Sequence, residues 1–297
     1  MTGQPETSPP PVIVTDAACD IPAAAQEQYG ISIAPLRLLF GEESYLSGVD
    51  MSQDQFYERL ARGDVHPSTS QPTVPEFVDL YRRVGQGGAP ILSIHLSEGL
   101  SGTINVARQA ASQLPDLSIT VHDSGTLTSA LGIQVITAAR AAQAGHTIPQ
   151  IIPLLEADYR NGDMLFCVDD LSYLHRGGRI GAVRYQIGQA LRIKPLVTVA
   201  KTGENAGTYI TAGRVRSLPK AVDAMVNHIV DHIGAGSKLR AIPIFGDDPA
   251  LAQQLGEQLA QTFDCVYLEV IATAPILGVH VGPKALGIGY APGDWPV

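Results

Sequence analysis

Short apolar runs rich in β-branched residues alternate with longer amphipathic segments through the first half of the chain. The runs predicted as strands are 12–15, 33–40, 91–96 and 118–122. The segments predicted as helices are 53–62, 74–84, 102–113 and 127–144. Strands separated by helices of this length are typical of βαβ units, so we expect a parallel sheet in this half.

The second half of the chain has a different order of elements. Its predicted strands are 164–168, 241–245, 266–271 and a last strand that starts at Leu286, and its predicted helices are 149–161, 183–191, 221–233 and 249–262. A turn at 203–207 separates two further short runs, 196–199 and 208–212, and this spacing is typical of a β-hairpin. A hairpin combined with strand–helix–strand segments predicts a mixed sheet.

These patterns predict an α/β protein with two domains. We expect a parallel-sheet α/β domain over 12–160 and a mixed-sheet α/β domain over 161–297. They are preceded by a polar, proline-rich tail at 1–11 that we expect to be disordered. A chain of 297 residues is long enough for two domains, and 45% hydrophobic against 16% charged residues is the composition of a globular protein.

The net charge of −9 restricts the partners. Nucleic acids and anionic membranes attract a surplus of Lys and Arg, so we expect no nucleic acid partner and no general affinity for membranes. Transient contact with a membrane surface stays open because the chain has one local basic group, made of Arg176, Arg179, Arg184, Arg192 and Lys194. We expect the protein to be a monomer.

The sequence has no pattern typical of a metal or cofactor site. Cys19, Cys167 and Cys265 are odd in number and far apart, so we expect buried free thiols in a reducing compartment. The eight histidines have no ligand spacing, and neither a Gly-x-Gly-x-x-Gly nor a Walker sequence is present. The first residues do not resemble a signal peptide, and 270–281 is too short to span a bilayer. We therefore expect a cytoplasmic protein without metal or cofactor.

Four short segments rich in hydroxyl groups and glycine lie next to apolar runs, namely 69–72, 97–103, 123–126 and 280–287. Hydroxyls, backbone N–H groups and a helix N-terminus can together hold a small buried anion without a facing cation. In open α/β sheets, ligands bind outside the carboxyl ends of the strands. The turns that follow Asp16, Leu96 and His122 should therefore converge at one edge of the sheet.

Each of these segments also has a purely structural interpretation. Ser101 or Gly102 can serve as the N-cap of the following helix, although a cap alone does not require the glycines on both sides of Ser101. Thr73 and Glu76 have the spacing of a capping box, which leaves the hydroxyls of 69–70 unexplained.

Two further residues stay ambiguous. His280 lies between two valines and is either a core residue or a functional one, and Ser124 is either a turn residue or a ligand contact. A serine hydrolase or acyltransferase with Ser101 or Ser124 as nucleophile and His280 as base is an alternative, although the chain has no Gly-x-Ser-x-Gly motif. A regulatory module that binds another small anion is a third alternative.

Six segments match, in order, the motifs of a known family. They are 14–20, 69–72, 100–103, 123–124, 174–180 and 282–287. Each motif is weak alone, but together they cover nearly the whole chain, which resembles the DegV family of fatty-acid-binding proteins. The resemblance implies two α/β domains with one long-chain fatty acid in a tunnel between them.

The resemblance also implies roles for particular residues. The residues that would hold the carboxylate or lie beside it are Thr69, Ser70, Ser97, Ser101, Gly102, Ser124, His280 and Gly282. In the family's role the protein presents this carboxylate to an ATP-dependent kinase subunit, which makes the acyl phosphate. The binding protein itself is then no enzyme and needs no cofactor, and Arg176 and Arg179 would form the docking region near the head group.

The chain departs from the family pattern at two positions. Glu98 stands where a small hydroxyl residue is usual, and Lys284 stands where glycine is usual. A carboxylate at Glu98 would repel a bound carboxylate unless its side chain faces solvent. Lys284 would add positive charge at the entrance.

Overall fold

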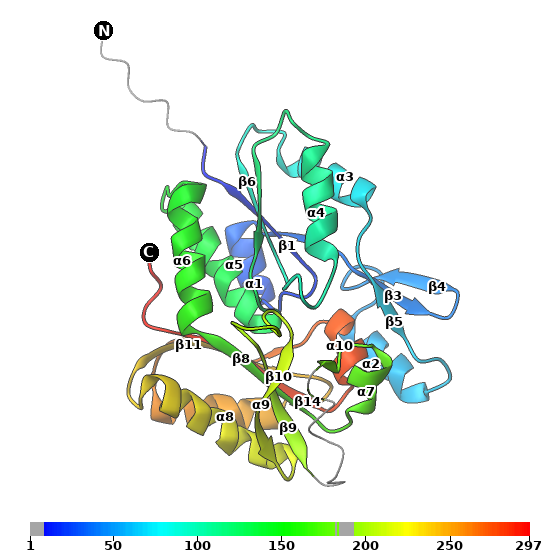
Figure 1. The fold of residues 1–297 in the computed structure, drawn as a ribbon, viewed down its shortest axis with the longest axis vertical. Helices are drawn as coiled ribbons and strands as arrows, with labels where there is room; N and C mark the ends of the chain where they lie inside the picture. Colours follow the sequence, from blue (N-terminus) through cyan, green and yellow to red (C-terminus); the bar gives the residue numbers. More distant parts are fainter. Residues whose placement is uncertain (1–8, 182, 184–192) are drawn as a thin grey trace.

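The first half of the chain forms a parallel sheet, as predicted. The computed structural model describes residues 9–181, 183 and 193–297 (Figure 1). The strands of this sheet are β1 (Val12–Asp16), β2 (Ser32–Ala34), β6 (Ile91–His95) and β7 (Ile119–Asp123). They pair in the order β2-β1-β6-β7, and every pair is parallel.

The helices of this half follow the amphipathic pattern closely. They are α1 (Ala23–Tyr29), α2 (Gln53–Arg62), α3 (Val74–Val84), α4 (Thr103–Ser112), α5 (Thr128–Gln143) and α6 (Ile148–Asn161). The bounds of α2 and α3 are those that the apolar spacing predicts, and those of α4, α5 and α6 differ by one residue at most. Only α1 was not predicted.

The predicted run at 33–40 is wrong as a single strand. It divides at Pro35 into β2 and β3 (Arg37–Phe40), which belong to different sheets. Proline cannot donate to a strand ladder, which favours a break at this position. β3 pairs with β4 (Glu43–Leu46) and β5 (Ser68–Ser70) in an antiparallel three-stranded sheet. Thr69 and Ser70, predicted in a loop, therefore lie in a strand.

The second half contains the predicted mixed sheet. Its strands are β8 (Asp163–Val168), β9 (Lys194–Val199), β10 (Tyr209–Val215), β11 (Lys238–Phe245), β12 (Asp264–Leu268), β13 (Ile271–Ala272) and β14 (Ala285–Pro292). The order is β10-β9-β8-β14-β11-β12, with β13 also on β11. β12 and β13 run parallel to β11, and the other pairs are antiparallel. The predicted strand 266–271 is thus two strands.

The helices of the second half are α7 (Ser172–Arg176), α8 (Leu218–Ile233), α9 (Ala250–Thr262) and α10 (Pro275–Val281). The sequence predicts α8 and α9 but misses the short helices α7 and α10. The predicted helix 183–191 lies outside the described residues, apart from Val183, and so does the tail up to residue 8. None of the described helices is long and apolar enough to cross a membrane.

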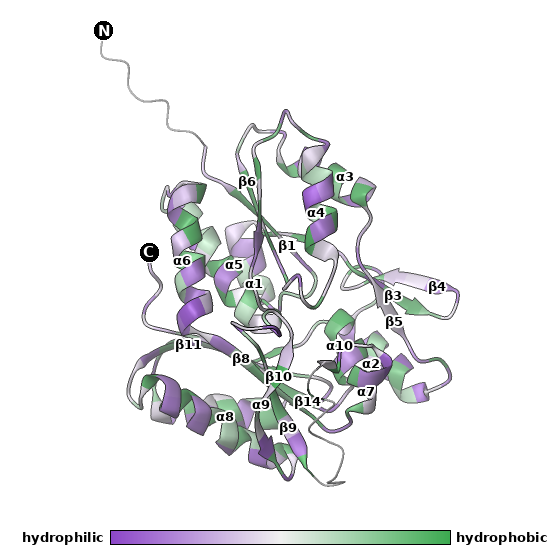
Figure 2. Cartoon of the chain, in the orientation of Figure 1, coloured by the Kyte–Doolittle hydropathy of each residue, from purple (hydrophilic) through white to green (hydrophobic). Residues whose placement is uncertain are grey.

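Helix α5 is the centre of the molecule. Nearly all of its residues are buried, and it packs against β1 of the first sheet and against β8, β11 and β14 of the second. A helix that is apolar all round is expected in such a position. On the other side of the mixed sheet, α8 turns its hydrophilic residues outward (Figure 2). The chain passes from one sheet to the other between α6 and β8, and there we propose the domain boundary at 160/161.

Candidate functional site

The turns at the carboxyl edge of the parallel sheet converge, as predicted. β1, β6 and β7 are neighbours in this sheet, so their ends lie side by side. The backbone N–H of Ser97 donates to the carbonyl oxygen of Thr126 over 2.7 Å. The N–H of Leu96 donates to Oδ2 of Asp16 over 3.0 Å. Three loops remote in sequence are therefore tied together by hydrogen bonds.

The structure joins two of the predicted site residues directly. Thr69 lies in β5 and His280 in the last turn of α10, 211 positions away, and Thr69 Oγ1 is 3.0 Å from His280 Nε2. Thr69 is brought there because β5 pairs with β3, and α10 packs on both strands. The sequence motif named both residues but could not pair them.

The imidazole of His280 is neutral near physiological pH. Burial lowers its pKa to about 4, and the positive charges of Arg179 and His66 add to the effect. Nδ1 is buried and has no hydrogen-bond partner among the described residues. Because an unpaired buried donor is rarer than an unpaired acceptor, we place the proton on Nε2. His280 then donates to Thr69, and the Thr69 hydroxyl proton is free for a ligand.

The loop between α7 and residue 180 encloses the other side of this imidazole. A Cβ at Gly177 would overlap Nδ1 of His280, so glycine is required for the close approach. Gly282 has φ +74°, and a Cβ there would lie 2.6 Å from the ring of Tyr173. The predicted loop at 169–180 is therefore partly helical, and packing against α10 explains its Gly177, whereas Gly178 has a positive φ of +71°.

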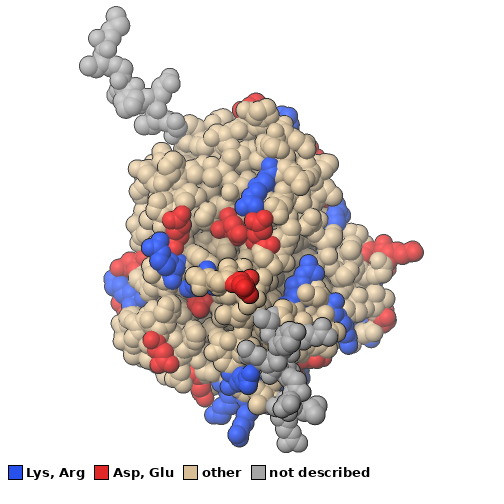
Figure 3. All heavy atoms as spheres, viewed as in Figure 1, with Lys and Arg blue, Asp and Glu red and all other residues tan. Residues whose placement is uncertain are grey.

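The two arginines predicted near the head group lie beside this pair. Nη1 of Arg176 is 3.4 Å from Nδ1 of His66. Nη1 of Arg179 donates to the carbonyl oxygen of Gly177 over 2.6 Å, and its charge acts on His280. Figure 3 shows Lys and Arg side chains gathered on this face, over α2, α7 and α10. Two further predicted members of the basic group, Arg184 and Arg192, lie outside the described residues.

Ser101 and Gly102 lie next to the segment that carries Thr69. Gly102 is the N-cap of α4, and a Cβ on it would lie 2.5 Å from Oε1 of Gln71. Oγ of Ser101 accepts the backbone N–H of Thr103 over 3.2 Å and lies 2.9 Å from its hydroxyl. The two hydroxyl-rich segments, 69–72 and 101–103, are thus neighbours at the start of α4.

Ser97 and Ser124 have other partners. Oγ of Ser97 donates to the carbonyl oxygen of Gly207, in the loop of the β9–β10 hairpin, over 2.8 Å. Oγ of Ser124 donates to the carbonyl oxygen of Thr126 over 3.1 Å and accepts its N–H over 3.3 Å. Neither hydroxyl bonds to Thr69 or His280, and the turn interpretation explains Ser124 fully. Ser97 links the first half of the chain to the hairpin of the second.

The remaining predicted residues lie at the edges of this region. Ser70 is opposite Arg37 in the β3–β5 ladder and is partly buried. The carboxylate of Glu98 is exposed, 2.8 Å from Nη1 of Arg108, and this hydrogen bond lowers its pKa. It therefore points to solvent, as a bound anion nearby would require. Lys284 is exposed.

An apolar slot lies between the two halves of the chain and borders α10, where its lining residue Val281 follows His280 in sequence. Its lining is Leu127, Thr128, Met164, Phe166, Tyr209, Ile244, Phe245, Thr273, Leu277, Val281, Ala285 and Leu286. The space totals about 360 Å³ together with the open solvent at its mouth, but only about 20 Å³ of it can hold the centre of a water molecule. The slot is therefore narrow, and aliphatic and aromatic side chains line most of it.

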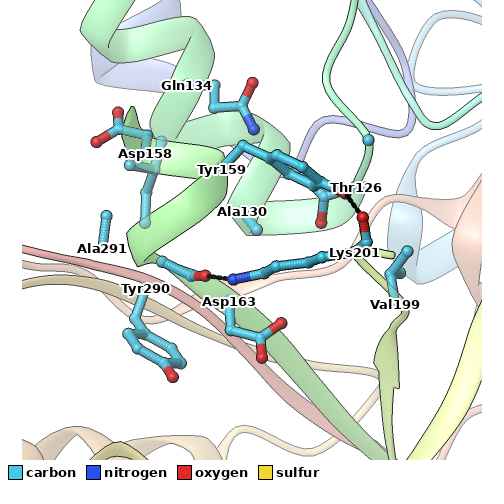
Figure 4. A pocket seen from close by; sticks show the side chains of 13 residues that line it. Thr126, Ala130, Gln134, Asp158, Tyr159, Asp163, Val199, Lys201, Tyr290 and Ala291 are labelled. Atoms are coloured by element: carbon cyan, nitrogen blue, oxygen red, sulfur yellow. Dashed lines mark hydrogen bonds between the residues drawn. The ribbon is translucent and has the colours of Figure 1, made fainter. Parts of the chain in front are cut away.

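A second cavity between the halves has a different character. Figure 4 shows the Lys201 side chain lying between Tyr159 and Asp163 in this cavity. The Lys201 ammonium donates to the carbonyl oxygen of Gly162, and Tyr159 donates to the carbonyl oxygen of Lys201 over 3.3 Å. About 10 Å³ of the space can hold the centre of a water molecule. Lys201 and Tyr159 are thus bonded to the protein itself, whereas the buried Oε1 of Gln134 in the lining has no partner among the described residues.

The sequence missed a buried chain of hydrogen bonds at the same sheet edge. Tyr81 donates to Ser93 over 2.9 Å, Oγ of Ser93 is 2.7 Å from Nε2 of His95, and Nδ1 of His95 is 2.9 Å from Oδ2 of Asp16. The order is that of a hydrolase triad. All four side chains are fully enclosed, however, so no substrate reaches Ser93. The sequence signal for this chain was the spacing of two residues between Ser93 and His95, which places both side chains on the same face of a strand.

The three cysteines are free thiols, as predicted. Cys19 and Cys167 are buried, and burial raises the pKa of both, that of Cys167 to about 12. Cys265 is only half-buried, which corrects the prediction that all three are enclosed. Within the described ranges, no three His, Cys, Asp or Glu side chains are grouped so that they could hold a metal ion.

Comparison with known proteins identifies relatives of one family along nearly the whole chain. A family model described as "Uncharacterised protein, DegV family" matches residues 11–293. A DegV domain-containing protein of Deinococcus radiodurans is 38% identical and covers 96% of both chains. Protein DegV of Bacillus subtilis is 30% identical over 93% of this chain and 97% of its own.

Solved structures agree with these relatives. The structure of DegV, a fatty acid binding protein from Bacillus subtilis, superimposes with a TM-score of 0.88 at 29% identity, covering 96% of this chain and 100% of that one. A stearic acid-binding protein from Eubacterium ventriosum superimposes with a TM-score of 0.81 at 27% identity, covering 95% and 98%. With its parallel sheet, its mixed sheet and these relatives, the chain belongs to the DegV family.

Proposed function

We propose that this protein binds one long-chain fatty acid and presents its carboxylate to an ATP-dependent kinase partner, which forms the acyl phosphate. The tail occupies the apolar slot between the two halves, and the carboxylate lies at Thr69 and His280. The protein itself carries out no chemistry. The observation that supports this most directly is an apolar slot that is lined from both halves and includes Val281, the residue that follows His280 of the Thr69–His280 pair.

The tail supplies most of the affinity in this proposal. A sixteen-carbon acid buries about fifteen methylene or methyl groups at ~0.8 kcal/mol each, or about 12 kcal/mol before costs. Association and ordering remove a large part of this gain. The narrow slot adds a further cost, because its side chains must move apart to admit an acyl chain. Binding therefore requires the slot to open. Of the helices that contribute lining residues, α10 is the shortest and is our candidate for the element that moves.

The head group contributes orientation. Hydrogen bonds to a charged acceptor add roughly 1.5–3 kcal/mol each. With the proton of His280 on Nε2, the Thr69 hydroxyl can donate to a carboxylate, and Ser101 lies on the neighbouring segment. Arg176 and Arg179 are close enough to attract a phosphate donor but are not bonded to Thr69. In this proposal the carboxylate end, not the tail, faces the partner.

Organic extraction of the purified protein followed by mass spectrometry tests the ligand. We expect a co-purifying long-chain fatty acid, and loss of most of it in the double variant Thr69→Ala, Ser101→Ala. The control is Ser112→Ala with Thr262→Ala, because both hydroxyls donate to helix carbonyl oxygens away from the slot. Equal lipid content in both double variants would remove Thr69 and Ser101 from the site. Covalent labelling by a fluorophosphonate would contradict a carrier without its own chemistry.

Reconstitution with an ATP-dependent fatty acid kinase subunit tests the presentation step. Arg176→Ala or Arg179→Ala should reduce acyl phosphate output severalfold while the content of bound fatty acid stays unchanged, since neither guanidinium lines the slot. Arg82→Ala on α3 is the control, because this arginine pairs with Asp116 at the surface. Wild-type turnover in both variants would exclude this docking region.

A further inference from the structure

The motif from Asp16 to Asp20 ends in a carboxylate that the proposed function does not use. Asp20 is 3% exposed. Its Oδ2 accepts the hydroxyls of Thr128 and, over 2.8 Å, of Thr273, and its Oδ1 accepts the backbone N–H of Ala274 over 2.8 Å. One carboxylate from the first sheet's edge thus holds the start of α5 and the residues just before α10.

Two of these partners line the apolar slot. Thr128 and Thr273 both belong to its wall, and they come from different halves of the chain. Because both hydroxyls are engaged by Asp20, the two threonines have mainly their methyl groups left for the slot. A buried carboxylate thereby keeps this part of the wall apolar.

The three residues meet just before the start of α10, at the opposite end of this helix from His280. Thr273 precedes α10, whereas His280 lies in its last turn. Leu277 and Val281 lie four residues apart within α10, and Thr273 precedes the helix, so these three lining residues form a stripe that runs from before the start of α10 to its end. A tail that starts at His280 and follows this stripe reaches Thr273 last.

The backbone at this end is strained. Thr128 has φ +52° and is the one non-glycine residue with a positive φ in the described part of the chain. A β-branched residue in this conformation is unfavourable and persists only where its surroundings over-determine it. Here the N–H of Thr128 donates to the carbonyl oxygen of Ala18 over 2.8 Å, and its hydroxyl donates to Asp20. Such strain is concentrated at ligand-contacting positions in proteins.

The carboxylate is also costly where it lies. Its partners in the described structure are two hydroxyls and one backbone N–H, with no cation among them. A buried charge without a paired cation is retained only where its hydrogen bonds are needed. At the start of α10, the backbone N–H of Ala274 needs only one acceptor, and Oδ1 of Asp20 provides it. This cap does not explain why two threonine hydroxyls also donate to Asp20.

We propose that Asp20, Thr128 and Thr273 close the far end of the slot and thereby set the length of acyl chain that fits. The inference rests on the proposed function, since it concerns the tail end of the same ligand. Three donors fixed on one carboxylate form a rigid stop. An acyl chain that is too long would have to break hydrogen bonds in a buried, low-dielectric environment, and a chain that is too short would leave the end empty.

Binding of saturated acids from twelve to twenty carbons to the wild-type protein and to two opposite variants tests the stop. Thr128→Gly removes the side chain, and glycine adopts φ +52° without strain, so this variant should fold. It should shift the preferred length to longer chains, with a Kd ratio changed about tenfold per two carbons. Thr273→Ile replaces the hydroxyl by a larger ethyl group in the wall and should shift the preference to shorter chains.

Thr137→Val is the matched control. Thr137 also lies on α5 and donates to a buried carboxylate, that of Asp158, over 2.6 Å, but it does not line the slot. It should keep the wild-type length preference. Asp20→Asn preserves the volume but replaces one acceptor by a donor, and it should broaden the preference.

The outcomes separate this inference from the proposed function. If the wild-type protein binds none of the acids, the proposed function fails. If the wild-type protein binds them and Thr128→Gly and Thr273→Ile keep its length preference, the stop is overturned although the function stands. A shift in the same direction for Thr137→Val would also overturn it, because the change would then be a general effect on the fold.

Discussion

At the scale of single residues, two buried groups titrate in opposite senses. Burial raises the pKa of Asp20 from 3.8 to about 6, and hydrogen bonds from Thr128, Ala274 and Thr273 oppose this shift. Burial lowers the pKa of His280 from 6.5 to about 4. Both groups are therefore held toward their neutral forms, as desolvation without an opposite charge requires.

Asp20→Asn should change how stability depends on pH. Because the folded pKa of Asp20 is above the unfolded value, the folded state retains its proton between about pH 4 and 6, and the free energy of unfolding falls as pH rises through this window. A shift of about two units corresponds to about 3 kcal/mol. Relative to the wild type, Asp20→Asn should gain stability over that window, as measured by urea unfolding at several pH values.

His280→Gln should have the opposite effect in nearly the same window. The folded pKa is below the unfolded value, so the folded wild type binds fewer protons and becomes more stable as pH rises from about 4 to 6.5. The variant lacks this gain, so its stability relative to wild type should fall with pH. Parallel pH profiles for both variants would contradict the assigned shifts.

Gly177→Ala tests the enclosure of His280. The backbone at Gly177 has φ −69° and ψ −7°, which alanine adopts readily, so a helix-end substitution here would ordinarily be neutral or favourable. The new Cβ would overlap Nδ1 of His280, and we expect the imidazole to be displaced from Thr69. Fatty acid content should fall with little loss of the folded state. Gly178→Ala, with open space around it but φ +71°, should instead lower stability and leave the bound lipid.

At the scale of elements, apolar spacing and capping patterns predicted the helices and strands that local contacts determine. The capping box at Thr73 and Glu76 is present, and α3 begins where it requires. Short elements were missed because their existence depends on distant partners: α10 has seven residues, and Asp20 accepts the N–H at its start. Similarly, β5 exists because β3 lies beside it.

In the candidate site, too, the sequence predicted what local segments determine but not what distant partners determine. The motifs named Thr69, Ser101 and His280, because each lies in a hydroxyl- or glycine-rich segment with its own local signal. They could not show that Thr69 bonds to His280, or that Ser97 bonds to Gly207, since these partners are 211 and 110 positions apart. Pairing across such separations is decided by the packing of sheets and helices, for which the sequence carries no local signal.

Thr73→Ala tests whether the start of α3 supports the site. Loss of an N-cap costs about 1 kcal/mol. Because the cap directly follows the segment 69–72, we also expect weaker retention of fatty acid. Thr147→Ala removes the equivalent cap of α6, far from the slot, and should lower the melting temperature similarly with lipid content unchanged. Equal lipid content in the two variants would confine Thr73 to a structural role.

At the scale of the whole molecule, the two halves share one interior. A single cluster of buried side chains extends from Ile94 of the parallel sheet to Phe166 of the mixed sheet. A buried ion pair reinforces the junction: Nη2 of Arg240 in β11 lies 2.7 Å from Oδ1 of Asp158 in α6. Arg240 also donates to Thr137 of α5 over 3.2 Å. The slot lies within this shared interior, so a ligand there contacts both halves.

Arg240→Met should therefore uncouple the halves unless the slot is filled. Removing one partner of a buried pair leaves Asp158 uncompensated, at a cost of about 3–5 kcal/mol. In delipidated protein we expect calorimetric unfolding to broaden or separate into two transitions, because the variant loses the buried pair that joins α6 to β11. Added fatty acid at 100 times its Kd should restore about 2.7 kcal/mol and a single transition, since it binds only when both halves are in place. The double variant Arg240→Met, Asp158→Leu removes both charges and should behave like the wild type. If fatty acid raises the stability of Arg240→Met without merging its transitions, the ligand contacts one half alone.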